Sequence, residues 1–400
     1  MALSHSPLIV TDGLVFMYDT GNRKSYVGEP TVNLTTDSPS QGGWNGSLNV
    51  LDSSTKKFRL NVSNFNGSPG QGWRSFTWDL NSYSGQSVTI SATVEVPSAS
   101  PGTFAWIMMG QGNTHTNTSG AGGYMGYSAA SERIQKTTTT TEHITWSGTV
   151  GSTGTASQPS GHVGFTVWYN DGTPSTNSYV EVSNVQIEIK SHATQFVNGT
   201  RSATAGLIDR TNNATIDISD ASFDSDAQMT FDGTDDYLAI PHDSSQSFSG
   251  DFSIEAVIKG EGSTANCIIQ KGSGNDYYQE YWLLQDMRSS PGMFMLIMGG
   301  SGNSSANYLS TASNLSQNIY YHVVATVSGS TSKIFVNGVQ AASGTISTRI
   351  QSTSDLRIGW RVDGFAATNG EIPLTKIYNK ALTSAEVLQN FNAIKSRFGL

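Results

Sequence analysis

Apolar and polar residues alternate with a period of two over much of this chain. The clearest run is residues 87–96, where every second residue from Val88 to Val96 is apolar and shares one face of an extended strand. Comparable runs recur at short intervals, separated by loops rich in Gly, Ser, Asn and Pro: residues 102–110, 142–150, 162–170 and 179–189. This spacing, with no helical pattern between the runs, predicts a sandwich of two antiparallel sheets.

A second series of short apolar runs follows in the C-terminal half. Its members are residues 229–233, 236–241, 252–260, 267–271, 280–285, 293–299, 319–327, 332–338, 356–360 and 371–378, and the isolated run 13–18 stands near the N-terminus. Asn337-Gly338 is a typical two-residue hairpin turn between two short strands. The pattern therefore predicts a second β-sandwich and an all-β protein.

The end of the chain carries the 3.6-residue period of an amphipathic helix, which we place at residues 383–396. Thr383 and Glu386 form a capping box at its start, and Gly399 stands where the helix would end. The apolar stripe consists of Val387, Leu388, Phe391 and Ile394. An isolated helix of this length is marginal in water, so we expect it to pack on its own domain, with docking on a neighbouring subunit as the alternative.

The composition fits folded β-domains and narrows the partners. Of the 400 residues, 36% are hydrophobic, 13% are charged and 42 are Gly, which disfavours charge-rich disorder. The net charge of −9 leaves no basic footprint for nucleic acid. Cys267 is the single cysteine, so no disulfide forms within the chain. No run has the pattern of a signal peptide or the length of a membrane span, so we expect synthesis in the cytoplasm without a visible export signal and without membrane insertion.

Five segments of the C-terminal series carry a resemblance to a known family: MTFDGTDDYLAIP (229–241), FSGDFSIEAVIKG (248–260), YYHVVATVSGSTSKIFVNGVQ (320–340), DLRIGW (355–360) and GEIPLTKIYNKALTSAEVLQNF (370–391). In order and spacing they resemble the laminin-G-like, concanavalin-A-like jelly-roll family. The closing stretch, which ends in RFGL, looks like the version common in bacteriophage virion proteins, and residues 180–202 resemble joints of phage tail and fibre proteins. The resemblance implies a jelly roll whose terminal helix is the family's own last element.

The opening strand of this jelly roll is separated from the rest of it. Single-piece relatives run directly from a strand resembling residues 12–26 to a segment resembling 206–216, whereas here the first β-series lies between them. A jelly roll places its ends close together, so an insertion there costs little. We therefore expect two antiparallel jelly-roll β-sandwiches, the first inserted after the opening strand of the second, and one C-terminal α-helix.

The expected parts are residues 1–30, with the opening strand of the C-terminal jelly roll, 31–198, an inserted sandwich, and 199–400, the laminin-G-like jelly roll. The pattern of the inserted part resembles a carbohydrate-binding module of the jelly-roll kind. Residues 14–18 should pair within the C-terminal domain beside the strand at 372–378.

The resembled family includes glucanases, so a catalytic pair of carboxylates is one possible feature of this chain. Those enzymes place their acid and nucleophile on one face of a strand, and no E-x-D-x-E pattern occurs here. Glu181 and Glu188 are seven positions apart, on opposite faces of a regular strand, and we read them as edge residues. Metalloprotease, nucleophile-elbow and phosphate-loop patterns are missing, and the seven His are scattered singly. The sequence predicts no enzyme.

Candidate binding residues lie in Gly-rich loops, where aromatic rings next to polar groups suit a sugar. The glycan-binding candidates are Trp73, Tyr124, Tyr277, Trp360, Arg361 and Asp363. For each aromatic residue, a place in the core or on the cap of the sandwich is the alternative. The turn FDGTDDYL offers Asp235 and Asp236 to calcium, which the resemblance allows at the sandwich rim, whereas Asp232 also suits a tight turn formed without metal.

The resemblance implies a non-enzymatic structural protein of the bacteriophage virion, located on the particle, contacting other virion proteins and forming a homo-oligomer. We expect an appendage or fibre-type adhesin that binds host-surface glycans, with many copies compensating weak single sites. The alternative is a head decoration or tail component whose jelly rolls join subunits without binding glycan. The missing signal and disulfides agree with this setting, because a virion leaves its host by lysis.

Overall fold

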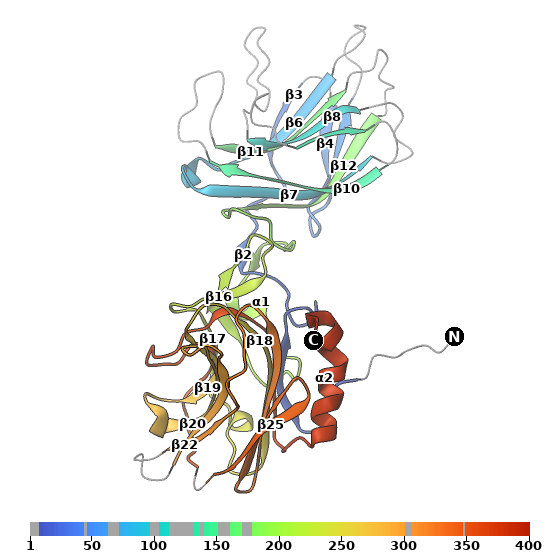
Figure 1. The fold of residues 1–400 in the computed structure, drawn as a ribbon. Coiled ribbons are helices and arrows are strands. Elements are labelled where there is room, and N and C mark those ends of the chain that lie inside the picture. Colours follow the sequence, from blue (N-terminus) through green and yellow to red (C-terminus); the bar gives the residue numbers. More distant parts are fainter. Residues whose placement is uncertain are drawn as a thin grey trace, which may run out of the picture. The chain divides into compact units, whose positions relative to one another are not determined.

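The computed structural model describes residues 8–43, 46–62, 72–96, 104–111, 132–136, 140–150, 161–169, 178–300, 306–346 and 349–400. The chain forms two compact units, which we call the C-terminal unit (residues 1–30, 202–224 and 228–400) and the inserted unit (residues 31–201 and 225–227). Each consists of two packed antiparallel sheets (Figure 1). The predicted fold class is therefore confirmed: an all-β protein with one sandwich inserted after the opening strand of the other.

Two sheets face each other in the C-terminal unit. The eight-stranded sheet runs in the order β15 (Ser222–Phe223), β16 (Met229–Asp232), β27 (Asn369–Tyr378), β18 (Phe252–Gly260), β23 (Tyr320–Ser328), β24 (Thr331–Val336) and β25 (Val339–Thr345), with β1 (Leu14–Asp19) also paired to β27. The seven-stranded sheet runs in the order β14 (Asp217–Asp220), β17 (Tyr237–Ile240), β26 (Leu356–Gly359), β19 (Ala265–Gly272), β20 (Gln279–Asp286), β21 (Met293–Gly299) and β22 (Ala306–Ser310). Short helical turns connect some strands: α1 (Ala203–Gly206), η2 (Ser244–Gln246) and η3 (Asp276–Tyr278).

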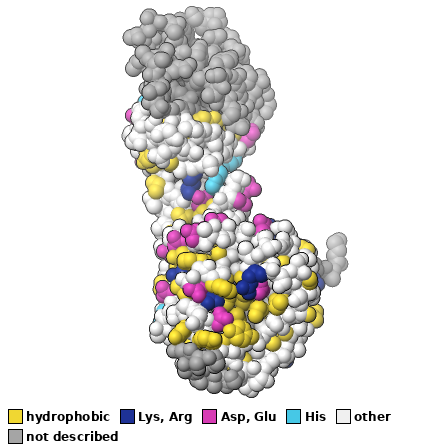
Figure 2. Space-filling model, turned by 60° about the vertical axis from the view of Figure 1, so that its left-hand side comes forward, with side chains coloured by type: hydrophobic (Ala, Val, Ile, Leu, Met, Phe, Trp, Pro, Cys, Tyr) yellow, Lys and Arg dark blue, Asp and Glu magenta, His cyan; other side chains and the backbone are white. Residues whose placement is uncertain are grey.

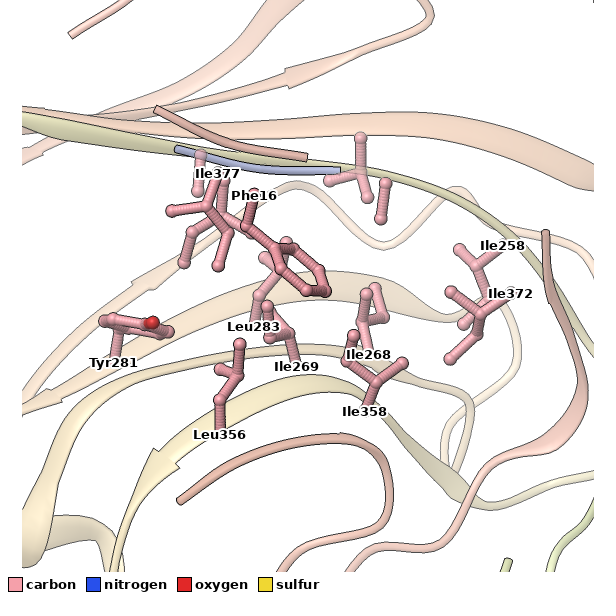
Figure 3. Packing of buried hydrophobic residues seen from close by; sticks show 14 of the residues in the cluster. Phe16, Ile258, Ile268, Ile269, Tyr281, Leu283, Leu356, Ile358, Ile372 and Ile377 are labelled. Atoms are coloured by element: carbon pink, nitrogen blue, oxygen red, sulfur yellow. The ribbon is translucent and has the colours of Figure 1, made fainter. Parts of the chain in front are cut away.

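One apolar core fills the space between these two sheets. Alternate residues of each strand point inward, as the period-two pattern predicts. Figure 3 shows Phe16 of β1 and Ile377 of β27 facing side chains of the opposite sheet, among them Ile269, Leu283 and Ile358. All five are fully buried. The core thus joins residues from both ends of the sequence.

The opening strand β1 belongs to this unit, although the inserted unit follows it in the sequence. It pairs antiparallel with β27, with Phe16 opposite Ile377 and Asp19 opposite Leu374. This is the predicted pairing of residues 14–18 with the strand at 372–378, and it is confirmed. The buried hydroxyl of Tyr18 also donates to the carbonyl of Ile372 at 2.7 Å.

We expect the Phe16→Leu variant to lower the unfolding free energy of the C-terminal unit by about 1 to 2 kcal/mol, because it shrinks a ring at the centre of that core. The transition of the inserted unit should not move. The matched control is Phe76→Leu, which removes the same atoms from the core of the inserted unit and should shift only the other transition. Differential scanning calorimetry of the full chain measures both, and a shift of the inserted unit by Phe16→Leu would contradict the assignment of β1.

The terminal helix α2 (Ser384–Phe398) packs on its own unit, as predicted, and runs two residues beyond the expected end. Thr383 and Glu386 make the predicted capping box, and Gly399 closes the helix with a left-handed φ of 68°. Val387 and Ile394 are buried against the outer side of the eight-stranded sheet, which α2 flanks in Figure 1. Leu388, placed on the apolar stripe from the sequence, is 46% exposed. No helix among the described residues has both the length and the apolar character to cross a membrane.

The inserted unit has the same plan with two five-stranded sheets. One runs in the order β10 (Thr140–Thr149), β7 (Ser87–Val96), β12 (Ser178–Glu188), β5 (Lys57–Val62) and β4 (Gly46–Asp52). The other runs in the order β3 (Ser40–Gly43), β6 (Gly72–Asp79), β11 (His162–Tyr169), β8 (Phe104–Gln111) and β9 (Glu132–Lys136). A separate two-stranded ribbon pairs β2 (Thr31–Val32) with β13 (Thr200–Arg201), and η1 (Asn81–Tyr83) precedes β7. The core between the two five-stranded sheets includes Phe76, Trp78 and Phe165, together with the inward residues of β7.

Candidate functional site

The seven-stranded sheet carries a second apolar cluster on the face turned away from the core. Along β20, Tyr281 and Leu283 enter the core, whereas Trp282 and Leu284 lie on the other face. Cys267 of β19 and Ala366 of the loop between β26 and β27 join them there. Figure 2 shows hydrophobic, basic and acidic side chains intermixed on the face of this unit that is turned forward.

Arg361 lies at the centre of this face, in the loop that follows β26. Its guanidinium carbon is 4.4 Å from the ring centre of Trp282 and 4.9 Å from that of Phe365. Nη1 donates to Asp276 at 2.8 Å and Nη2 donates to Asp363 at 2.7 Å. Arg361 is 3% exposed, so it fixes the two carboxylates from beneath rather than facing a ligand.

Three aromatic rings stand exposed around these two carboxylates: Tyr277, Tyr308 and Phe365. The hydroxyl of Tyr308 donates to Asp276 at 2.8 Å. Burial and this carboxylate raise the pKa of Tyr308 to about 12, so the hydroxyl stays protonated at neutral pH. The backbone N–H of Phe365 donates to Asp363 at 3.2 Å, which holds the chain at Phe365 beside this carboxylate.

We call this surface the Arg361 platform and define it by Asp276, Tyr277, Tyr308, Arg361, Asp363 and Phe365. It presents hydrogen-bond acceptors held in place by a buried cation, with flat apolar rings beside them. A ligand that fits carries several hydroxyl groups and one apolar face.

The structure brings four predicted glycan-site residues to one region. Tyr277, Arg361 and Asp363 belong to the platform, and Trp360 adjoins it, half-buried, with its ring centre 5.3 Å from that of Tyr237. The sequence did not single out Asp276, Tyr308 or Phe365. Asp276 and Phe365 lie within the Gly-rich segments that contain the predicted residues. The Arg361–Asp276 bond joins residues 85 positions apart, so no local pattern in the sequence indicates it.

Of the two candidates in the inserted unit, the structure places only the backbone of Trp73. Trp73, expected in a loop, lies on β6 opposite Trp168 of β11. That placement corrects the expectation, because the residues around Trp73 extend a strand rather than a turn. Tyr124 lies outside the described residues.

The calcium candidates form a small carboxylate cluster. Oxygens of Asp232, Asp235 and Asp236 lie within 4.8 Å of one another. Asp236 accepts the N–H of Asp232 at 2.7 Å, and Asp232 accepts the N–H of Thr234 at 2.7 Å, so both also shape the turn. Burial raises the pKa of Asp236, partly offset by a hydrogen bond from Ser222. A cation would relieve this crowding of charge.

Glu181 and Glu188 make ion pairs and hydrogen bonds within the inserted unit. Glu181 pairs with β5 on one side and with β7 on the other, so the prediction that it is an edge residue is wrong. Glu188 pairs with β7 alone. Glu181 pairs with Lys57 at 2.6 Å and with Arg59 at 2.5 Å. Glu188 is fully buried and accepts hydrogen bonds from Thr31 and Thr194. Their oxygens are engaged by the protein itself.

Residues 232–388 match the model of the concanavalin A-like lectin/glucanases superfamily, of the laminin-G type. A comparison with curated proteins gave no match. Among solved structures, a Trypanosoma rangeli sialidase with the inhibitor DANA is 16% identical with a TM-score of 0.36, over 46% of this chain and 30% of its own. The binding domain of Paraclostridial Mosquitocidal Protein 1 is 16% identical with a TM-score of 0.36, and the match covers 47% of this chain and 49% of that domain. A heptameric SAP-like pentraxin from Limulus polyphemus is 18% identical with a TM-score of 0.32, and the match covers 40% of this chain and 78% of the pentraxin. The chain thus spans less than a third of the sialidase that it resembles.

Proposed function

We propose that the chain is a non-enzymatic glycan-binding protein and that the Arg361 platform is its binding site. The observation that carries the proposal is the placement of two partly exposed carboxylates, Asp276 and Asp363, on a buried arginine among three exposed aromatic rings. Sugar hydroxyls donate to carboxylates, and the apolar face of a pyranose stacks on an aromatic ring. Because Arg361 already fixes both carboxylates, little order is lost when a sugar binds.

We further propose that the protein is a virion structural protein of a bacteriophage, of the appendage or fibre type, that binds host-surface glycans. The closing sequence through RFGL and residues 180–202 support this setting. A single shallow site of this kind binds weakly, and copies arranged in a homo-oligomer on a particle raise the overall affinity. A head decoration or tail component that joins subunits without glycan is the second proposal, and it needs no intact Arg361 platform.

Binding to an array of bacterial surface glycans tests the first proposal. We expect the full chain to bind at least one glycan, and the Phe365→Ala and Tyr308→Ala variants to lose about tenfold in affinity, since each removes a stacking ring. The matched control is Val339→Ala, which trims a side chain that is 69% exposed on β25, and it should bind as the wild type does. Unchanged binding by both aromatic variants would move the site away from the platform.

The same array, run with calcium and with a chelator, tests the proposal that Asp235 and Asp236 hold a calcium ion. Binding that depends on calcium in the wild type, but not in Asp235→Asn, would support that site.

Immunogold labelling of particles separates the two virion roles. Gold on the tail tip or fibres supports an adhesin, gold over the head supports decoration, and no gold on any particle refutes the virion setting.

A further inference from the structure

Arg357 is a half-buried arginine of β26 whose guanidinium makes no hydrogen bond. Its guanidinium carbon lies 4.5 Å from the ring centre of Tyr237 and 5.2 Å from that of Trp360, so it stands against two aromatic rings. No acceptor among the described residues bonds to any of its donors, and Nη1 is buried without a partner. A guanidinium in this state lacks the acceptor that its planar fork is shaped to bind.

The other half-buried or buried arginines that the structure describes are all bonded. Arg59 pairs with Glu181, and Arg361 pairs with Asp276 and Asp363. Arg201 donates to the carbonyl of Gln195, and Arg349 donates to those of Ser249 and Gly250. Nε of Arg201 and Nε of Arg361 are also buried without an acceptor, but each of those guanidinium groups is bonded through another nitrogen. Arg357 differs because no nitrogen of its guanidinium is bonded, so the group is available to a ligand or a water.

A second unbonded donor adjoins Arg357. The indole Nε1 of Trp360 is also buried without an acceptor. Trp360 precedes Arg361 in the chain. Leu356 and Ile358, on either side of Arg357, enter the core, so Arg357 lies on the outer face of the sheet with Cys267 and Trp282. Arg357 therefore borders the Arg361 platform on the same face of the sheet.

We propose that Arg357 binds the carboxylate of an acidic sugar residue, next to the ring held by the Arg361 platform. This assignment rests on the proposed glycan-binding function and narrows its ligand to acidic glycans. The platform offers carboxylates to hydroxyl groups, whereas Arg357 offers Nε and Nη2, which are not among its buried atoms, to an oxyanion. Asp217 and Asp220 place negative charge near Tyr237, whose ring Arg357 contacts. Recognition thus depends on direct bonds to the guanidinium rather than on long-range attraction.

A matched pair of ligands tests this proposal: methyl β-D-glucuronoside and methyl β-D-glucoside, which differ in the carboxylate at C6. We titrate the full chain, labelled with 15N-arginine, and follow the side-chain Nε–H signal of Arg357. The glucuronoside should shift this signal in a saturable way and bind about tenfold more tightly than the glucoside. In Arg357→Gln the two affinities should become equal, and Arg357→Lys, which keeps the charge but not the fork, should lose most of the preference.

Arg349→Gln is the control, since it removes a half-buried arginine whose donors already have acceptors, and it should keep the preference. Equal affinity of the two glycosides, no response of Arg357, or an unchanged preference in Arg357→Gln would each overturn the proposal. A stronger response to inorganic phosphate than to the glucuronoside would overturn the assignment to a sugar carboxylate. Phe365→Ala separates this proposal from the proposal that the Arg361 platform binds glycans. It should lower the affinity for both glycosides and leave the ratio of the two affinities unchanged.

Discussion

Replacing Glu255 by glutamine is expected to lower the unfolding free energy of the C-terminal unit by about 3 to 5 kcal/mol. Glu255 of β18 is fully buried together with Lys376 of β27, whose ammonium donates to Oε1 at 2.6 Å. Nε2 of His322 lies 3.2 Å from the same oxygen, and Asn390 of α2 donates to the other oxygen. The variant keeps the shape of the side chain but leaves the ammonium of Lys376 buried without a counter-charge.

The same carboxylate should make the stability of this unit depend on pH. Burial by itself raises the pKa of Glu255, but Lys376 and His322 outweigh burial and lower the pKa from 4.5 to about 2. A carboxyl group with a depressed pKa contributes its full stabilisation above its unfolded-state pKa and loses it as the pH falls through the folded-state pKa. The wild type should therefore lose stability between about pH 4.5 and 2 relative to Glu255→Gln, which has no such group to titrate.

Urea unfolding of the full chain, followed separately for the two transitions, measures this loss. The control is Lys380→Gln, which breaks the pairs of Lys380 with Asp12 and Glu386 at the surface and should change the unfolding free energy far less than Glu255→Gln does. The double variant Glu255→Leu with Lys376→Met removes both charges and should recover much of the loss. If Glu255→Gln unfolds within about 1 kcal/mol of the wild type, the buried pair does not stabilise the unit as argued.

Local signals in the sequence predicted most of the fold. Period-two runs located strands such as β7, β18 and β21 to the residue, because one side of each strand faces a core. The capping box at Thr383 and Glu386 located the start of α2 for an equally local reason. Strand β22 was not predicted, because its residues Ala306–Ser310 form a short run that is half-buried or exposed at a sheet edge.

Contacts between residues far apart in the chain could not be predicted from the sequence. In the sequence, Glu255 occupies a polar position of an alternating strand, which predicts an exposed side chain. It is buried because α2 packs over that face of the sheet. Arg361 was predicted as a ligand contact, whereas its bonds to Asp276 and Asp363 bury it beneath the surface. Arg357 carries no sequence signal, since a missing acceptor becomes visible only when its neighbours are in place. Periodicity reports which side of a strand is buried, but not which charges meet there.

Deleting Thr383–Leu400 is expected to abolish the transition of the C-terminal unit or to lower its midpoint by about 10 to 20 °C, while the inserted unit still folds. Val387 packs in the cluster of Val324 and Phe335, and Ile394 packs in that of Val257 and Leu374. Burying each such side chain contributes about 1.5 to 3 kcal/mol. The loss of the bond from Asn390 to Glu255 adds to this, so the total is a large part of the 5 to 15 kcal/mol typical of a domain.

Calorimetry of the truncated chain measures both transitions. If both midpoints are unchanged, α2 is instead an arm that docks on a neighbouring subunit.

The helix α2 and the buried pair of Glu255 and Lys376 should also be energetically coupled. Without α2, water reaches Glu255 and Lys376, so Glu255→Gln should cost much less in the truncated chain than in the full one. Should the truncated unit fail to fold, Ile394→Ala provides the same comparison with the helix loosened. An equal cost of Glu255→Gln in both backgrounds would show that α2 does not shield the pair, and the stabilisation would then come from the sheet alone.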